Sequence, residues 1–225
     1  MKEMLKRLLS EEVLHSFKVK TYRLLGKNKI KVASSNTLVL GNTFINNCSI
    51  RIRGHNNRVV FAGGGNILNN CKIEVFGNSC QIVIGESNLF VDSIFWLEDN
   101  NSKIIIGDNN KLCGKVHMGI VEGTTLEIKN KCLFSSDIYI TTTDSHSILD
   151  KSSGQRINQS QNVMINNHVW VGHKVIILKG VNITDNVIIG SGALVSKSVE
   201  EQNVIVAGNP AKIIKHNVDW DIQRL

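Results

Sequence analysis

The sequence predicts an all-β fold in which the chain winds as a parallel β-helix, preceded by a short N-terminal α-helical segment. Three observations support this prediction. Small aliphatic residues recur every six positions in the C-terminal half, and apolar residues recur every 22 positions in the N-terminal half. The chain of 225 residues also holds 26 asparagines, and asparagine tolerates the left-handed backbone of tight corners better than any residue except glycine.

Residues 1–33 form the predicted helical segment. Five apolar residues between Leu5 and Phe17 recur at helical spacing, which indicates one amphipathic helix or two short ones. Residues 1–31 carry nine Lys or Arg against three Glu, a surplus of six in a chain whose formal net charge is +7. This basic face of residues 2–31 is either solvated while the helix packs on the main body, or it contacts an anionic membrane surface. No recognition motif accompanies the charge, so nucleic-acid binding is not expected.

The main domain is predicted over residues 34–216, and its first half repeats every 22 residues. Eighteen residues make three six-residue units, so a coil of 22 holds about four extra residues at a corner. Glycine follows four of the five apolar positions, and a second series keeps the same step on another face. The two series are Leu40, Ala62, Ile84, Ile106 and Ile128, and Ile94, Val116 and Ile138.

The second half of the domain repeats every six residues. Each unit opens with a small aliphatic residue, and most units have Ile, Leu or Val two residues later. A period of six fits neither a 3.6-residue helix nor a two-residue strand repeat, but it fits a short strand plus a corner, three times per triangular coil. The opening residues are Val163, Val169, Val175, Val181, Val187, Ala193 and Val199, and the same spacing joins Leu126, Cys132 and Ile138.

The repeat is interrupted once, between Ile138 and Val163. The polar segment 141–162 breaks the six-residue register and predicts a long loop projecting from a rigid solenoid, which is where function tends to lie. A tail of residues 217–225 follows the domain.

The five cysteines have no CxxC spacing, and the N-terminus lacks the apolar core of a secretory signal. We therefore expect reduced, buried thiols in a cytoplasmic protein. No stretch approaches eighteen apolar residues, so no transmembrane helix is expected.

Four runs carry a family resemblance. SSDIYITTTDSHSILD (135–150), NNHVWVG (166–172), VIIGSGALVSK (187–197) and VIVAGNPAKIIK (204–215) resemble the hexapeptide-repeat acyltransferase superfamily. Their order resembles the maltose, galactoside and xenobiotic acetyltransferase branch, and the DSH and HVWVG segments are closer to capsule and sialic-acid O-acetyltransferases. The resemblance covers about residues 120–216 and implies a left-handed β-helix.

Acetyl transfer from a thioester to a sugar hydroxyl needs a general base near the hydroxyl, and the resemblance gives that role to His146. Asp144 either orients the imidazole or caps the loop. Trp170 follows the inward Val169, so its ring is predicted to point outward. It either lines the active site, by stacking or by donating its indole N–H to the oxyanion, or packs at a subunit interface. Backbone N–H groups near Gly172 are an equal candidate for the oxyanion site.

The resemblance also implies acetyl-CoA as co-substrate. Small residues around Gly190 leave space for its pantetheine arm, and lysines match positions that meet its phosphates in relatives. His173 stands where some relatives carry a serine. The candidate cofactor contacts are Gly172, His173, Gly190, Ser191, Ala193, Ser196, Lys197, Lys212 and Lys215.

His168 and His173 have a spacing similar to that of zinc-binding carbonic anhydrases on the same coil. A third convergent ligand is not evident, so no metal is expected.

By resemblance the protein is a homotrimer whose active sites lie between subunits, with Trp170 and Met118 on a face that buries against a neighbour. The expected reaction is acetyl-CoA-dependent O-acetylation of a capsule, lipopolysaccharide or sialic-acid sugar, in the cytoplasm or at the inner face of the membrane. Acetylation of a small xenobiotic or an amino sugar is an alternative, and a non-catalytic scaffold is a third. The sequence does not name the sugar.

Overall fold

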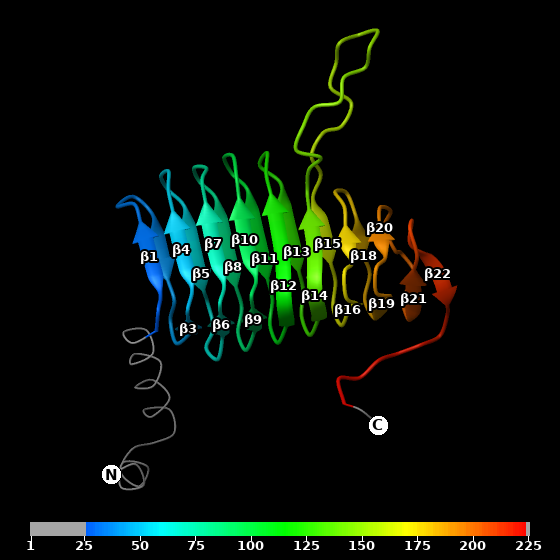
Figure 1. Cartoon of the computed structure of the whole chain (residues 1–225), viewed down its shortest axis with the longest axis horizontal. Helices are drawn as coiled ribbons and strands as arrows, with labels where there is room; N and C mark the ends of the chain where they lie inside the picture. The colour runs from blue at the N-terminus through cyan, green and yellow to red at the C-terminus, as the bar shows by residue number, and fades with distance from the viewer. Residues whose placement is uncertain (1–25, 224–225) are drawn as a thin grey trace, which may run out of the picture.

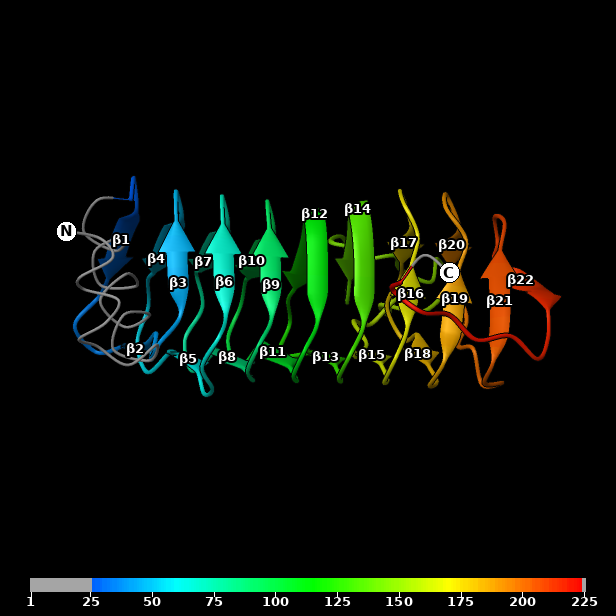
Figure 2. The same cartoon turned by 90° about the horizontal axis from the view of Figure 1, so that it is seen from below.

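The computed structural model describes residues 26–223, and these form a parallel β-helix of triangular cross-section. In Figure 1 the strands of the near face point upward, and Figure 2 shows β3, β6 and β9 returning along the underside toward that face. The chain therefore winds left-handed as it advances from the N-terminal to the C-terminal end. The prediction of an all-β, left-handed parallel β-helix is confirmed.

Three faces make up the prism, and each is a stack of parallel strands. Face A, nearest the viewer in Figure 1, holds β1 (Lys29–Val32), β4 (Ser49–Ile52), β7 (Lys72–Val75), β10 (Ile94–Leu97), the C-terminal ends of β12 (Lys111–Ile120) and β14 (Leu133–Thr141), β17 (Ile176–Ile177) and β20 (Leu194–Val195). Face B holds β2 (Thr37–Val39), β5 (Arg58–Phe61), β8 (Gln81–Ile84), β11 (Lys103–Ile106), β13 (Thr125–Ile128), β15 (Val163–Ile165) and β18 (Asn182–Ile183). Face C holds β3 (Phe44–Asn46), β6 (Ile67–Asn69), β9 (Leu89–Val91), the N-terminal ends of β12 and β14, β16 (Trp170–Val171), β19 (Val187–Ile189) and β21 (Val204–Ala207). The antiparallel strand β22 (Lys212–Lys215) ends the stack beside β21.

Both predicted periods appear in the strand register. Ile84, Ile106 and Ile128 are successive partners on face B, and Ile128 then pairs with Ile165 across the loop. Ile165 pairs with Ile183, eighteen residues on, so the coils shorten to three six-residue units where the strict repeat begins.

The six-residue series fills the core. Its seven opening residues, from Val163 to Val199, are all buried, and so are the residues two positions later in the strands. Each coil covers the inward side chains of the next, so the core is one continuous apolar column.

The 22-residue series is wrong by one position at its N-terminal end. Ile84 pairs with the buried Phe61, and the exposed Ala62 lies one residue beyond. Ile94 likewise pairs with His117 and not with Val116. The pairing steps by 23 residues at two separate places in this half, from Phe61 to Ile84 and from Ile94 to His117, and each step moves the inward positions by one.

The second of these steps also corrects the predicted place of Met118, which pairs with Phe95. Its side chain is fully buried in the core and not on an outer face. Cys113 is the other exception: it is exposed on β12, whereas the other four cysteines are buried as expected. Burial raises the pKa of Cys132 to about 12, so that thiol stays protonated.

Asparagines serve two purposes. Eight of them have a left-handed backbone at corners, as predicted. Another set forms a buried ladder that the composition did not reveal. Asn88 Oδ1 accepts a hydrogen bond from the Asn110 N–H at 2.8 Å, and Asn110 Oδ1 accepts one from the Cys132 N–H at 2.8 Å. Each amide group also donates to a backbone carbonyl of the next coil, so the ladder satisfies the backbone inside the corner.

We expect Asn88→Ala to lower the free energy of unfolding by about 1–3 kcal/mol, because it leaves buried N–H and C=O groups without partners. Urea denaturation measures the change. Asn182→Ala, at an exposed position of β18, is the control and should change stability by less than about 0.5 kcal/mol. Equal effects in the two variants would contradict a structural role for the ladder.

The ends of the domain differ slightly from the predicted boundaries. The first strand begins at Lys29, before the predicted start at residue 34, and the last ends at Lys215. Residues 1–25 of the predicted helical segment lie outside the described residues, and so does most of the basic stretch 2–31 with its suggested membrane contact. Within residues 26–223, no helix is long and apolar enough to cross a membrane.

Candidate active site

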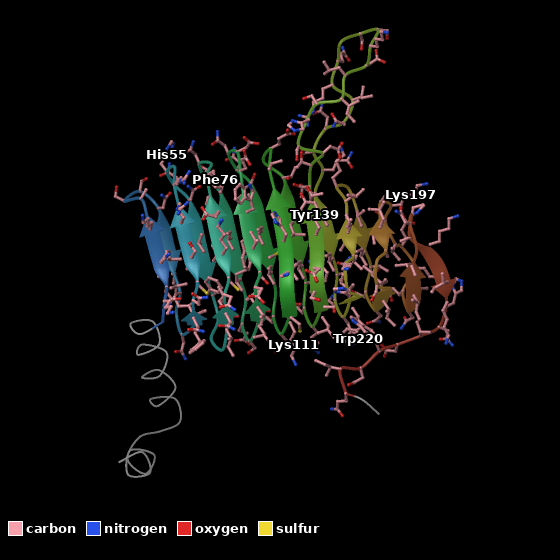
Figure 3. All side chains as sticks on the ribbon, viewed as in Figure 1. His55, Phe76, Lys111, Tyr139, Lys197 and Trp220 are labelled. Atoms are coloured by element: carbon pink, nitrogen blue, oxygen red, sulfur yellow. The ribbon has the colours of Figure 1, made fainter. Side chains whose placement is uncertain are left out.

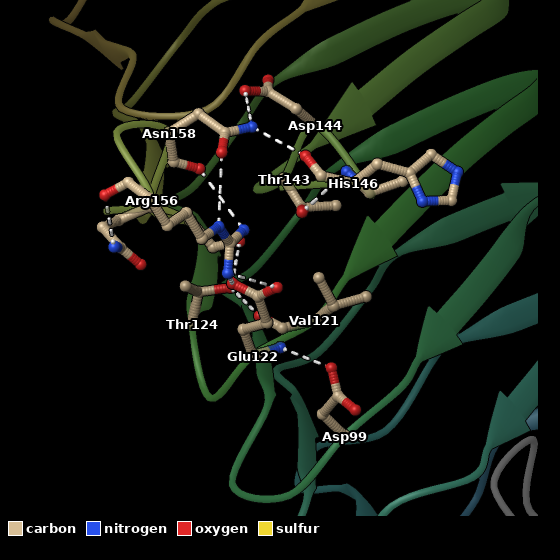
Figure 4. A network of polar contacts seen from close by, with 12 residues as sticks. Asp99, Val121, Glu122, Thr124, Thr143, Asp144, His146, Arg156 and Asn158 are labelled. Carbon is tan, nitrogen blue, oxygen red and sulfur yellow. Dashed lines mark hydrogen bonds and ion pairs between the residues drawn. The ribbon is translucent and has the colours of Figure 1, made fainter. Parts of the chain in front are cut away.

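The predicted loop leaves the prism after β14 and returns at β15, and it projects as an arm from the upper edge in Figure 1. Asp144, Ser145 and His146 lie at its base and are exposed. The His146 N–H donates to Asp144 O at 2.8 Å, and His146 O accepts from Asn158 Nδ2 at 2.8 Å. Both bonds use the backbone, and the imidazole points away from the polar network in Figure 4. The ring is therefore free to meet a substrate while its backbone is fixed.

Asp144 fastens the base of the loop. Its Oδ2 accepts hydrogen bonds from Lys179 Nζ at 2.5 Å and from Asn158 Nδ2 at 2.9 Å. The Lys179 ammonium, followed by the Asn158 amide, lowers the pKa of the Asp144 carboxyl, which keeps it ionised. Both contacts attach the loop to the prism, so of the two roles left open for Asp144 the geometry favours capping over orienting the imidazole.

A second anchor joins the arm to the preceding coil. Arg156 Nη1 donates to both carboxylate oxygens of Glu122 at 3.0 Å, and Ser160 Oγ donates to Glu122 Oε2 at 2.8 Å (Figure 4). Arg156, and after it Ser160, lowers the pKa of Glu122. The buried Asn158 links the two anchors, because its Oδ1 accepts from the Ile148 N–H and from Arg156 Nε. Only the polarity of the loop hinted at this network in the sequence.

We expect Arg156→Gln to loosen the arm without unfolding the prism, because the bidentate pair with Glu122 is one of its two attachments. Amide hydrogen exchange in residues 144–160 should quicken about tenfold, and exchange in β11 and β13 should not change. Lys151→Gln, an exposed charge on the same arm, is the matched control. Unchanged exchange in Arg156→Gln would mean that this pair does not hold the arm.

Trp170 lies on β16 of face C with its ring outward, as predicted, and is 39% exposed. No hydrogen-bond partner of its indole N–H is found within residues 26–223, whereas the Gly172 N–H already donates to Ile189 O at 2.8 Å. His146 and Trp170 make no contact with each other within the described chain. The two predicted catalytic groups are therefore both accessible but on different faces.

The C-terminal tail completes the surroundings of Trp170, which the sequence did not predict. The tail runs back along face C in Figure 2, and the Trp220 indole N–H donates to His168 O at 2.9 Å. The Trp220 ring stacks on the His168 ring, with 4.3 Å between the ring centres, and its centre lies 6.0 Å from that of the Trp170 ring. A groove of about 330 Å³ opens beside Trp220, with Lys111 and Lys131 on its border.

The small residues of the predicted cofactor groove have a structural reason of their own. A Cβ on Gly172 would lie 2.7 Å from Ile189 O, and one on Gly190 would lie 2.9 Å from the Ala207 Cβ. Close stacking of successive corners therefore requires both glycines. Ala193 points into the core, so only its backbone is available to a ligand. Ser191 is exposed at the same corner, and its Oγ accepts from the His173 N–H at 3.2 Å.

His173 lies between faces C and A, beside Ser136 and Asp137. Its Nδ1 is 2.9 Å from Ser136 Oγ and 3.1 Å from Ser136 O, so Ser136 holds this side of the ring, and no hydrogen bond of the other ring nitrogen is found within residues 26–223. Asp137 Oδ2 is 3.7 Å from the same nitrogen. His168 lies at a different corner and is occupied by Trp220 and Asn186. No group of three or more potential metal ligands occurs within residues 26–223.

The remaining predicted contacts are at the C-terminal end of the prism. Ser196 and Lys197 are exposed in the turn after β20, and Lys212 and Lys215 are exposed at the two ends of β22. No ion pair within the described chain involves any of the three lysines, which leaves them available to an anionic ligand.

Comparison with known proteins agrees with this fold. No protein-family model matches the chain. It is 37% identical over 160 residues to the polysialic acid O-acetyltransferase of Neisseria meningitidis, which covers 62% of the chain and 74% of that protein. It is 38% identical over 119 residues to the polysialic acid O-acetyltransferase of Escherichia coli O1:K1, and this match spans only 38% of that relative's length.

Two solved structures of polysialic acid acetyltransferases are also similar to this chain. The polysialic acid O-acetyltransferase OatWY superposes with a TM-score of 0.74 at 29% identity, over 88% of this chain and 90% of that one. The polySia-specific acetyltransferase NeuO superposes with a TM-score of 0.80 at 27% identity, over 87% and 83% of the two chains.

Proposed function

The chain belongs to the hexapeptide-repeat acetyltransferase family that includes the polysialic acid O-acetyltransferases, and on this premise we propose that it transfers acetyl from acetyl-CoA to a hydroxyl of a surface-glycan sugar. The observation that carries the proposal is the 37% identity across most of the Neisseria meningitidis enzyme. The exposed imidazole on a doubly anchored loop supports it. A sialic-acid polymer is the first acceptor to test, because the two relatives described above are named for it.

His146 acts as the general base in this proposal. Its imidazole takes the proton of the acceptor hydroxyl while the hydroxyl oxygen attacks the thioester carbonyl carbon. The tetrahedral intermediate then collapses, the carbon–sulfur bond breaks, and the proton passes from the imidazolium to the thiolate of coenzyme A. The product is an acetyl ester, and the imidazole returns to its neutral form.

Trp170 supplies the donor for the oxyanion. Its indole N–H has no partner within the described chain, and the Gly172 N–H is already bonded to Ile189 O. This contrast favours the indole over the backbone amide near Gly172 as the group that stabilises the intermediate.

Coenzyme A would lie along the corner of Gly172, Gly190 and Ser191, with its phosphates toward Lys197, Lys212 and Lys215. The open space around Gly192, where a Cβ would meet no atom within 4 Å, supports this path. The second ring nitrogen of His173, which has no hydrogen-bond partner within the described chain, is also available to it.

A homotrimer would bring His146 of one subunit to Trp170 of another. The arm supports assembly, because Ile148, Leu149 and Ile157 are all more than half exposed on it. Large side chains grouped in this way usually mark an interface. Sedimentation of the full chain measures the assembly, and a monomeric protein that is fully active would refute this part of the proposal. Four buried, unpaired cysteines support a cytoplasmic site of action.

The test of the activity is acceptor-dependent release of free thiol from acetyl-CoA. The panel holds polysialic acid, sialic acid monomer, neutral glycans and small amino sugars. Thiol release with a polyanionic glycan supports the proposal, and release only with a small amino compound would favour the xenobiotic or amino-sugar alternative. If the protein does not bind acetyl-CoA, the non-catalytic scaffold is the alternative that remains.

A further inference from the structure

Aromatic side chains gather on face A, on the outer side of the prism. The Phe76 and Trp96 rings lie 4.6 Å apart, and the His117 and Tyr139 rings lie 5.2 Å apart. Trp96, His117 and Tyr139 are at outward positions of neighbouring strands, and Phe76 directly follows β7. Figure 3 places Phe76 and Tyr139 on the near side of the prism. Within residues 26–223, face B presents no aromatic ring at an outward strand position.

Arginine and lysine side chains surround the first pair of rings. The Arg53 guanidinium carbon lies 4.9 Å from the centre of the Phe76 ring, and Lys72 Nζ lies 5.9 Å from the centre of the Trp96 ring. Arg51 occupies the strand position two coils before Trp96. We refer to Arg51, Arg53, Lys72, Phe76 and Trp96 as the aromatic–basic platform.

Glu74 holds the cations of the platform in place. Its side chain is only 2% exposed, and its carboxylate oxygens lie 3.7 Å from Arg51 Nη1 and 3.6 Å from Lys72 Nζ. Neither oxygen has a hydrogen-bond partner within the described chain. A buried charge opposed only by these two cations strongly favours keeping them above it. The two side chains are therefore preorganised, which lowers the entropy lost when they bind a ligand.

The platform keeps a positive surplus. Lys31 pairs in register with Arg51, and a shallow hollow of about 820 Å³ is bordered by Lys31, Arg51 and Arg53. Two carboxylates oppose these cations. Glu74 is buried beneath them, and Glu98 accepts a hydrogen bond from the Trp96 indole at 3.1 Å. The formal charge of this region is therefore +2, from four cations (Lys31, Arg51, Arg53 and Lys72) and two carboxylates.

We propose that the aromatic–basic platform binds the acceptor as an extended anionic polysaccharide, away from the sugar that is acetylated. Sugar rings present apolar C–H faces that pack on aromatic rings, and their carboxylates pair with guanidinium groups. Strands about 4.8 Å apart repeat these contacts along face A. The rings lead through His117 and Tyr139 to β14, whose end at Thr141 opens into the loop that carries His146. This inference rests on the proposed function and adds a binding site for the polymer outside the reaction centre.

The test compares charge removal on two faces of the full chain. Arg51→Gln with Arg53→Gln alters the platform, and Arg58→Gln with Lys103→Gln removes the same charge from face B. Titration calorimetry without acetyl-CoA measures binding of polysialic acid, with dextran as the neutral probe. We expect the platform variant to weaken polysialic acid binding about tenfold and the face B variant less than twofold. The KM for the polymer should rise in parallel, and the rate with sialic acid monomer should not change.

Trp96→Leu tests the stacking component separately. It should weaken polymer binding about fivefold with an unchanged salt dependence, whereas the double charge variant should show a reduced one. Equal polymer binding in wild type and the platform variant overturns the inference, and so does wild-type binding no tighter than to dextran. Dissociation of the platform variant into smaller assemblies also overturns it, since face A would then be an interface between copies.

Failure of the inference is distinguishable from failure of the proposed function. If the platform variant acetylates the polymer with the wild-type KM, the platform is not a polymer-binding site, and the proposed acetyltransferase activity still stands. If the polymer binds in a platform-dependent way but no condition releases thiol, the proposed activity is rejected and the binding site still stands.

Discussion

His146→Ala should lower kcat for acetyl transfer by about 10²- to 10⁴-fold and leave the KM for acetyl-CoA nearly unchanged. The reason is that the acceptor hydroxyl is a weak nucleophile until a base removes its proton. The imidazole makes no side-chain contact within the described chain, so the substitution removes chemistry and not structure. Both hydrogen bonds of residue 146, to Asp144 O and from Asn158 Nδ2, use its backbone and persist in alanine.

The measurement is steady-state thiol release with the best acceptor of the panel. His55→Ala is the matched control, because His55 is also an exposed histidine at a corner of the prism. It should retain kcat within about twofold. Hydrogen exchange in residues 144–160 should be equal in wild type and His146→Ala. A kcat within tenfold of wild type would mean that another group is the base, and faster exchange in the loop would mean that the loss is structural.

Much of the fold could be predicted because each coil needs small apolar side chains at the same inward positions. A residue such as Val175 or Val187 must be small and apolar wherever the coil has three six-residue sides, so spacing alone identified the core. The prediction failed where coils are longer. One 23-residue step placed Phe61 where Ala62 was expected, and a second one buried Met118. A coil that is longer by one residue has no distinct residue type to mark it, so the change shows only in which residues pair between strands.

The candidate site could be predicted in part for a related reason. The loop is visible as a break in the repeat, the family resemblance points to His146 within it, and the outward ring of Trp170 follows from the inward Val169. The partners of the loop are not visible, because Lys179 reaches Asp144 across 35 residues and Arg156 reaches Glu122 across 34. These pairs depend on how the arm folds back on the prism. The position of Trp220 depends likewise on the path of a tail that has no repeat.

Trp170→Phe separates the two roles that the sequence left open for this residue. Phenylalanine keeps an aromatic ring for packing and removes the indole N–H. If that N–H stabilises the oxyanion, kcat should fall about 10²- to 10³-fold while the KM for acetyl-CoA changes little. If Trp170 only packs at an interface, the variant should keep kcat within a few fold, and its assembly state is the property that would change.

Trp220→Phe is the control for the aromatic surroundings. Its indole N–H is bonded to His168 O, 2.9 Å away, so its loss costs a structural hydrogen bond but no donor to the reaction. The two variants remove the same atoms from neighbouring rings, 6.0 Å apart. A kcat that falls at least tenfold further in Trp170→Phe than in Trp220→Phe therefore assigns the oxyanion donor to the indole of Trp170. Equal losses would return that role to a backbone amide, which would first have to give up its bond to Ile189 O.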